Sequence, residues 1–176
     1  TLIRHGLMLA FAAAVFFLII TPGPGVLSVA GIGSGFGFKA GNRFVFGLWV
    51  GNNFVALLVV SGLAVAVMAD PVVRTVLLGA STAYLLYLAA RIALAGSKIA
   101  FIERQSPPGT TDAILLQFVN PKAYAVNTAF FSGFGFLPAE PSAEILIKFV
   151  IMNAIWIPIH YLWLWAGVTV RRLDLP

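Results

Sequence analysis

Two proline motifs interrupt long apolar runs of this chain, and both would free backbone groups that can bind a ligand. The first is TPGPG at residues 21–25, and the second is NPK at residues 120–122. Proline has no backbone N–H and glycine allows close approach to the backbone, so Pro22, Gly23 and Pro24 predict a broken helix. A single proline would indicate only a kink. Because half-helix N-termini attract anions and C-termini attract cations, the breaks are our first candidates for a binding site.

The second motif adds side chains to its freed backbone. Asn120 precedes Pro121 and can use its amide for backbone groups or for a ligand. Lys122 has two interpretations. It is a cation at membrane depth, which indicates a functional residue, or it is an interfacial anchor whose helix begins there and whose ammonium reaches the headgroups.

Polar residues also occur in three other apolar segments. Asn52 and Asn53, in GLWVGNNF, are costly in lipid, so at least one should point into a helix bundle, either toward a ligand or toward another helix. Tyr84 is expected to pack, with a hydroxyl that lines a cavity as the alternative. We interpret Asn153 and His160 as hydrogen-bonded structural groups.

The residue types exclude several other chemistries. The chain has no cysteine, which excludes thiol catalysis, disulfide exchange and thiolate metal sites. The sequence has no metal-ligand cluster, nucleophile triad or paired carboxylates, and GIGSGFGF lacks the spacing of a dinucleotide loop. No Asp or Glu lies inside the predicted membrane spans, so the simplest proton carrier is missing from them. We expect no catalytic residue, no metal and no cofactor, and therefore no enzyme.

The composition indicates an all-α integral membrane protein. Hydrophobic residues make up 60% of the chain and charged residues only 10%, against roughly 25% charged residues in average soluble domains. A spanning helix needs about 20 mostly apolar residues. Five spans fit, with the first and fourth broken by proline: residues 6–33, 44–68, 72–95, 113–136 and 143–170. A short basic turn, FKAGNR at residues 38–43, is expected between the first two.

The basic residues indicate orientation. Lys and Arg collect in cytoplasmic loops, so the net charge of +5 does not require nucleic acid as a partner. Seven basic residues fall on one side of the five spans: Lys39, Arg43, Arg91, Lys98, Arg104, Arg171 and Arg172. Arg4, Arg74 and Lys148 fall on the other. This distribution predicts an N-terminus outside the cell.

A repeated pentapeptide predicts two related halves. SGFGF occurs at residues 34–38 and again at 132–136, each at a similar distance after a proline break. Three spans per half would invert the second half relative to the first, and such repeats with broken helices are typical of secondary transporters. We expect one transport domain over residues 1–176: a first repeat at 1–96, a cytoplasmic loop at 97–112, and a second repeat at 113–176 that stops before a sixth helix.

These motifs together resemble a known family. TPGPG, FKAGNRFVFGLWVGN, AYLLYLAARIAL and FVNPKA, in this order and spacing, are similar to the lysine exporter (LysE/RhtB) family of bacterial amino-acid effluxers. The resemblance implies a six-helix inverted repeat in the inner membrane that exports small amino acids, driven by the proton gradient. The two break motifs match it by position. Asn52 departs from it, because many members carry an acid there, and this puts carboxylate-based coupling in doubt.

We therefore predict a secondary transporter that exports small amino acids or derivatives across the bacterial cytoplasmic membrane, embedded in lipid, with a homodimer as an expected assembly. The alternatives are an ion or metal exporter of a related fold and a non-transporting structural subunit. The predicted substrate-binding residues are Pro22, Gly23, Pro24, Asn52, Asn53, Tyr84, Asn120, Pro121 and Lys122.

Overall fold

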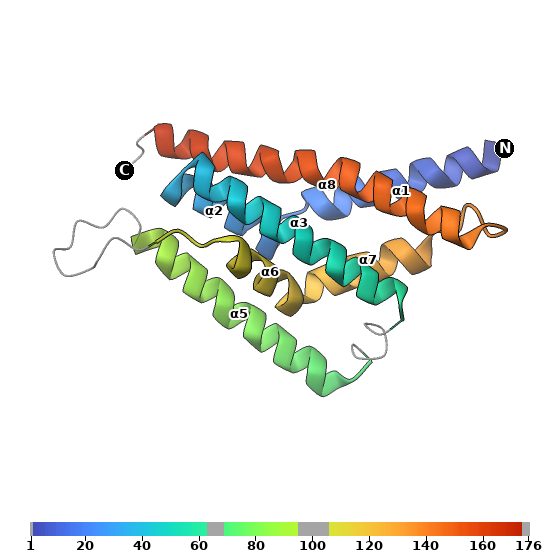
Figure 1. Cartoon of the computed structure of the whole chain (residues 1–176), viewed down its shortest axis with the longest axis horizontal. Helices are drawn as coiled ribbons and strands as arrows, with labels where there is room; N and C mark the ends of the chain where they lie inside the picture. Colours follow the sequence, from blue (N-terminus) through green and yellow to red (C-terminus); the bar gives the residue numbers. More distant parts are fainter. Residues whose placement is uncertain (1, 63–68, 95–105, 174–176) are drawn as a thin grey trace.

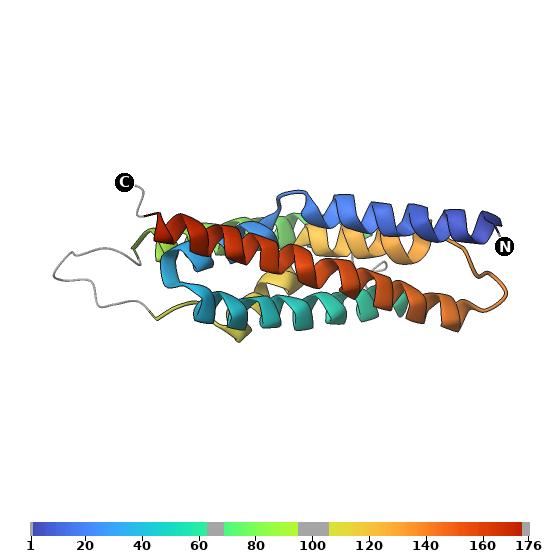
Figure 2. The ribbon, with the colours of Figure 1, turned by 90° about the horizontal axis from the view of Figure 1, so that it is seen from above.

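A computed structural model describes residues 2–62, 69–94 and 106–173, and within these ranges the chain forms seven helices and no strand. The helices form rods, some of them made of two half-helices in a row, and successive rods run in alternating directions roughly along one long axis (Figure 1). The described part of the chain begins and ends at opposite ends of this axis (Figure 2). The prediction of an all-helical protein is confirmed.

The first rod is broken at TPGPG, as predicted. Helix α1 (Leu2–Ile20) and helix α2 (Pro24–Phe36) follow each other along the long axis (Figure 1). Pro24 occupies the first helical position of α2, where its missing N–H costs nothing. Extended backbone at Gly23 separates the two half-helices.

The other broken rod is interrupted at Asn120, also as predicted. Helix α6 (Thr110–Val119) ends there, and helix α7 (Pro121–Gly133) begins with Pro121. The residue before a proline is driven out of the helical region, and Asn120 has φ −83 and ψ 104.

The expected basic turn at residues 38–43 is wrong, because these residues form the first turns of helix α3 (Phe38–Val60). Gly37 alone reverses the chain after α2, with φ +84, a conformation that favours glycine. Helix α5 (Pro71–Leu94) follows. The predicted ends of the second and third spans, at residues 68 and 95, and most of the predicted loop 97–112 lie outside the described residues.

Helix α8 (Pro141–Arg172) corrects two expectations. Lys148 was counted among the basic residues of the outer side, but it lies within α8, is only 2% exposed, and pairs with Glu144 at 2.8 Å. Because Glu144 lies in α8 as well, the statement that no acid occurs in the spans is wrong. The pair is tolerated because Glu144 accepts N–H bonds from Phe136 and Leu137.

Small residues let the rods approach closely. A Cβ at Gly47 would lie 2.3 Å from Thr110 O, and one at Gly51 would lie 2.8 Å from Gln117 Cβ, so these glycines hold α3 against α6. A Cβ at Gly167 would lie 2.0 Å from Ala30 O, between α8 and α2. In the described residues α3 packs mainly against α6 and less against α2 and α7, whereas α8 packs mainly against α2 and less against α1.

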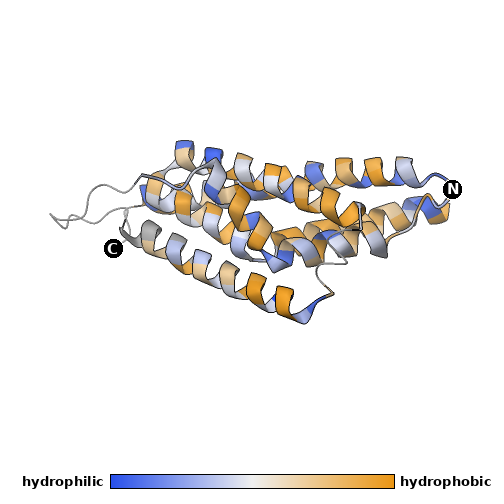
Figure 3. Ribbon diagram, turned by 60° about the horizontal axis from the view of Figure 1, so that its bottom comes forward, coloured by the Kyte–Doolittle hydropathy of each residue, from blue (hydrophilic) through white to orange (hydrophobic). Residues whose placement is uncertain are grey.

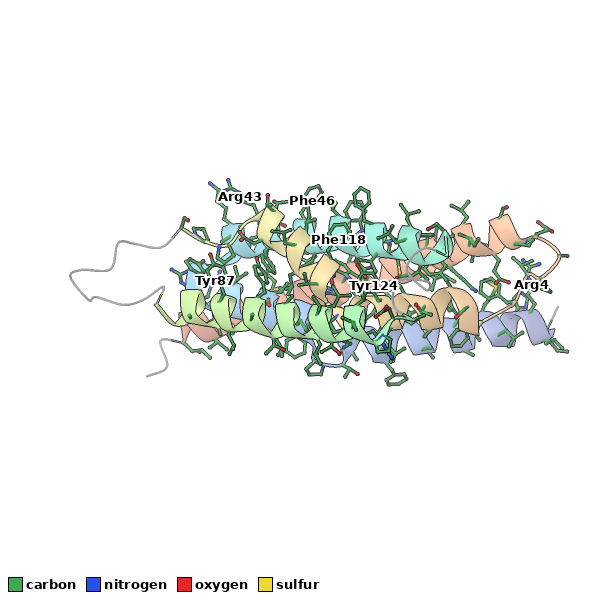
Figure 4. All side chains as sticks on the ribbon, turned by 90° about the horizontal axis from the view of Figure 1, so that it is seen from below. Arg4, Arg43, Phe46, Tyr87, Phe118 and Tyr124 are labelled. Carbon is green, nitrogen blue, oxygen red and sulfur yellow. The ribbon has the colours of Figure 1, made fainter. Side chains whose placement is uncertain are left out.

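The outer surface is apolar along the rods. Three helices, α1, α3 and α8, are long and apolar enough to cross a membrane, by length and composition, and α2 and α6 are shorter apolar helices. Apolar residues cover most of the rod length, with many hydrophilic residues near the ends (Figure 3). Arg4 and Arg43 lie toward opposite ends of the long axis (Figure 4). This distribution is that of a multi-pass membrane protein.

Candidate functional site

A cavity lies where the two helix breaks meet. Its empty volume, with the part open to the outside included, is about 470 Å³. The lining residues are Leu18, Ile19, Thr21, Gly23, Gly25, Val26, Asn52, Gln117, Asn120, Lys122, Ala123, Val126, Phe130, Met152, Trp156 and His160.

Lys122 joins the two breaks. Its Nζ donates a hydrogen bond to the carbonyl oxygen of Thr21 at 2.7 Å, just beyond the end of α1. The outer part of its side chain lies against Gly23, where an added Cβ would be 2.8 Å from Lys122 Cδ and 2.9 Å from Nζ. A half-helix C-terminus favours a cation. The half-buried ammonium of Lys122 therefore lies between the end of α1 and the start of α2.

The two half-helix N-termini differ. The first turn of α7 is capped, because Lys122 N donates to Asn120 Oδ1 at 3.1 Å. The first turn of α2 has Gly23 as its N-cap and no side-chain cap. Gly25 and Val26 in that turn are buried and line the cavity. The N-terminus of α2, next to the Lys122 ammonium, is therefore the one that can receive an anion.

A set of amides covers the side formed by α3, α6 and α7. Gln117 Nε2 donates to Leu48 O at 3.4 Å, and Asn120 Nδ2 donates to Gln117 Oε1 at 3.3 Å. Asn127 Nδ2 donates to Asn52 Oδ1 at 3.1 Å. These bonds hold the amides of three helices on one wall, and Asn52 and Asn120 both line the cavity.

His160 of α8 forms the opposite wall together with Trp156. The two rings are stacked with centroids 3.4 Å apart, and His160 Nδ1 lies 2.9 Å from Trp156 O. Because a carbonyl oxygen can only accept, Nδ1 carries the proton and Nε2 faces Gly25, whose added Cβ would be 3.7 Å away.

The charge of the cavity lining is positive only. Among its described lining residues there is no Asp or Glu, and Lys122 is its one permanent charge. Most of the remaining wall is apolar: Leu18, Ile19, Val26, Ala123, Val126, Phe130, Met152 and Trp156. Such a site can hold a small molecule that combines one anionic group with an apolar part.

The structure brings four of the nine predicted residues into the cavity wall: Gly23, Asn52, Asn120 and Lys122. Pro22, Pro24 and Pro121 form the breaks beside it. The other two have partners elsewhere. Asn53 and Asn153 exchange two hydrogen bonds of 3.0 Å, and the Tyr84 hydroxyl donates to Asp112 O at 2.9 Å.

Three polar residues at or beside the cavity were not among the predicted site residues. Gln117 lies one helical turn before Asn120, so helical spacing from the break could have found it. Asn127 lies four positions after Ala123, on the lining face of α7. His160 gave no such signal, because only the packing of α8 across the breaks places it there.

Comparison with known proteins finds a family that the chain matches. The family model described as LysE type translocator matches residues 16–173, which include both breaks and all the cavity-lining residues. No curated protein and no solved structure was found to match the chain.

Proposed function

Because the chain belongs to the LysE type translocator family, we propose that it is a secondary transporter that exports small amino acids or their derivatives across the bacterial cytoplasmic membrane. The cavity between the two broken helices carries this proposal. Irregular backbone at membrane depth is tolerated where it is buried in protein or lines a water-filled cavity, and transporters place their substrates at such breaks.

The substrate carboxylate binds at the first break. It is held by the N–H groups of the first turn of α2 and by the Lys122 ammonium, which Thr21 O fixes at 2.7 Å. Charge-assisted hydrogen bonds of this kind are stronger than neutral ones. Asn52 and Asn120 give further polar contacts. Asn53 and Tyr84 act only as structural groups, because their bonding atoms are engaged outside the cavity.

Alternating access comes from one half moving against the other, with repeats at residues 1–96 and 113–176 on either side of a loop at 97–112. Two observations support the inverted repeat. The rods α3 and α8 each pack on the broken rod of the other half. The reciprocal pair of Asn53 and Asn153 joins α3 to α8 at positions 100 residues apart.

Coupling to the proton gradient, an N-terminus outside the cell and a homodimer are further parts of the proposal. The orientation is supported by charge: with Lys148 buried, the outer side keeps Arg4 and Arg74 against seven basic residues inside. Coupling must use a group other than a cavity carboxylate, since the described lining has none.

The experiment is efflux from cells that express the full-length protein and are preloaded with a labelled amino-acid mixture. Wild type is compared with Pro24→Ala and Lys122→Ala. Pro71→Ala and Lys39→Ala are matched controls, because Pro71 also begins a helix and Lys39 is an exposed cation, and neither lines the cavity.

We expect wild type and both controls to lose one or a few amino acids faster than cells without the protein. Pro24→Ala and Lys122→Ala, at equal expression, should not. Wild-type efflux equal to that of cells without the protein, for every amino acid in the mixture, would contradict the proposed function.

A further inference from the structure

We infer that Asn127 is the acceptor for the substrate ammonium group, and that the cavity is therefore built for zwitterions of zero net charge with an apolar side chain. This inference rests on the proposed function. It adds the protein group that binds the substrate ammonium and the class of amino acid that fits the cavity.

Asn127 has a buried acceptor without a partner. The residue is 1% exposed, and its Oδ1 is the one atom among the described buried side-chain N and O atoms with no hydrogen bond. The orientation of the amide is fixed, because Nδ2 donates to Ala123 O at 2.8 Å and a carbonyl can only accept. Buried acceptors without donors are rare and costly, so Oδ1 calls for a donor that the described chain does not supply.

Asn127 lies next to residues that line the cavity. Ala123, Val126 and Phe130 line the cavity from the same face of α7, and Asn127 lies between them in the helical repeat. Asn52, which accepts from Asn127 Nδ2, also lines the cavity. The other polar contact of Asn52 is weak, a 3.9 Å approach to the sulfur of Met152. Asn127 is not itself among the lining residues, so the proposal includes a shift of these neighbouring side chains that opens Asn127 Oδ1 to the cavity.

The position suits the second pole of an amino acid. Lys122 and Asn127 are five residues apart on α7, which is about 7.5 Å along the helix. The proposal is that one amino acid, with a hydrogen bond at each end, bridges these two side chains. The carboxylate then lies near Lys122 and the start of α2, and the ammonium donates to Asn127 Oδ1.

The lining of the cavity also determines which substrate side chain fits. A second ammonium group, as in lysine, would meet the Lys122 charge and apolar walls, and no carboxylate among the described lining residues compensates it. An apolar side chain instead contacts Val126, Phe130 and Met152. Leucine fits this description, and lysine does not.

The test measures the affinity of the purified full-length protein for three probes: leucine, lysine and 4-methylpentanoate, which is leucine without its ammonium group. Wild type should bind leucine about 10-fold or more tightly than 4-methylpentanoate, since hydrogen bonds to charged groups have this effect on affinity. Lysine should bind at least about 10-fold more weakly than leucine on the same grounds.

Asn127→Leu should bind leucine and 4-methylpentanoate equally, because the contact with the ammonium group is lost. Asn153→Leu is the matched control: it breaks another interhelical amide pair, outside the cavity, and should keep the wild-type preference. Asn52→Asp is a second variant, since its carboxylate still accepts from Asn127 and adds a negative charge to the lining. It should improve lysine binding at least about 10-fold relative to leucine.

The inference would be overturned if Asn127→Leu still preferred leucine over 4-methylpentanoate as wild type does. The same result is expected if Asn127 Oδ1 binds only a water molecule and not the substrate ammonium. Wild type binding lysine as tightly as leucine would also overturn the inference. Neither result touches the proposed function, which fails separately if cells show no amino-acid efflux.

Discussion

Replacing Gly23 with alanine should move the Lys122 ammonium away from the first break without removing a charge or the break itself. Gly23 has extended backbone, with φ −158 and ψ 179, which alanine adopts without strain. The added Cβ would lie 2.9 Å from Lys122 Nζ and 2.8 Å from Cδ. The flexible end of the lysine side chain must therefore move, while the backbone of both half-helices stays in place.

The size of the effect follows from these distances. Non-bonded heavy atoms separate to roughly 3.5 Å, so Nζ must retreat by roughly 0.6 Å. The bond from Nζ to Thr21 O, now 2.7 Å, then exceeds the ordinary range, which ends at about 3.2 Å. Charged hydrogen bonds contribute about 1.5–3 kcal/mol. Because Lys122 is only half-buried, the lower value applies to its proposed bond with the substrate carboxylate, and the loss of that bond corresponds to a change in substrate affinity of about tenfold.

The assay is the concentration dependence of efflux for Gly23→Ala, with Gly135→Ala as control, because a Cβ at Gly135 meets nothing within 4 Å. We expect about a tenfold higher half-saturating substrate concentration for Gly23→Ala and no change for Gly135→Ala. Equal values for both variants and wild type would refute the carboxylate site at Lys122.

Two further predictions concern stability, measured by thermal unfolding in detergent. Gly167→Ala should destabilise the protein by about 1–3 kcal/mol, because the new Cβ would lie 2.0 Å from Ala30 O; Gly79→Ala, with open space around it, should not, and equal effects would contradict close packing of α2 and α8. Lys148→Met should destabilise by about 3 kcal/mol by leaving the Glu144 carboxylate without its buried partner. Adding Glu144→Gln should recover part of this loss, and no recovery would show that the ion pair is not its cause.

The two breaks could be predicted because their causes are local. Proline lacks a backbone N–H and restricts the residue before it. A half-helix therefore begins at Pro24, and Asn120, which precedes Pro121, separates two half-helices, independently of the surrounding structure. The spacing of Gly47 and Gly51, four residues apart on α3, is also local, and both glycines lie against α6. In these places sequence and structure agree.

The partners of the polar residues could not be predicted, because they depend on helix rotation and on contacts across the chain. Lys122 was open to two interpretations, and only the packing of the two broken rods brings it to Thr21, 101 residues away. Asn52 and Asn53 are adjacent but point to different partners, Asn127 and Asn153. Neighbouring residues of a helix are about 100° apart, so one of the two faced the cavity and the other did not.

Thiol labelling tests most directly the claim that substrates pass through the cavity between the breaks. The chain has no cysteine, so Val126→Cys, in the cavity lining, gives a single reactive position on α7. Ala129→Cys, on the exposed face of the same helix, is the control. A water-soluble maleimide should label Val126→Cys but not the lipid-facing Ala129→Cys, and saturating concentrations of the exported amino acid should slow this labelling. Val126→Cys protein that retains efflux but is not labelled, or is labelled at the same rate with and without the amino acid, would contradict the account.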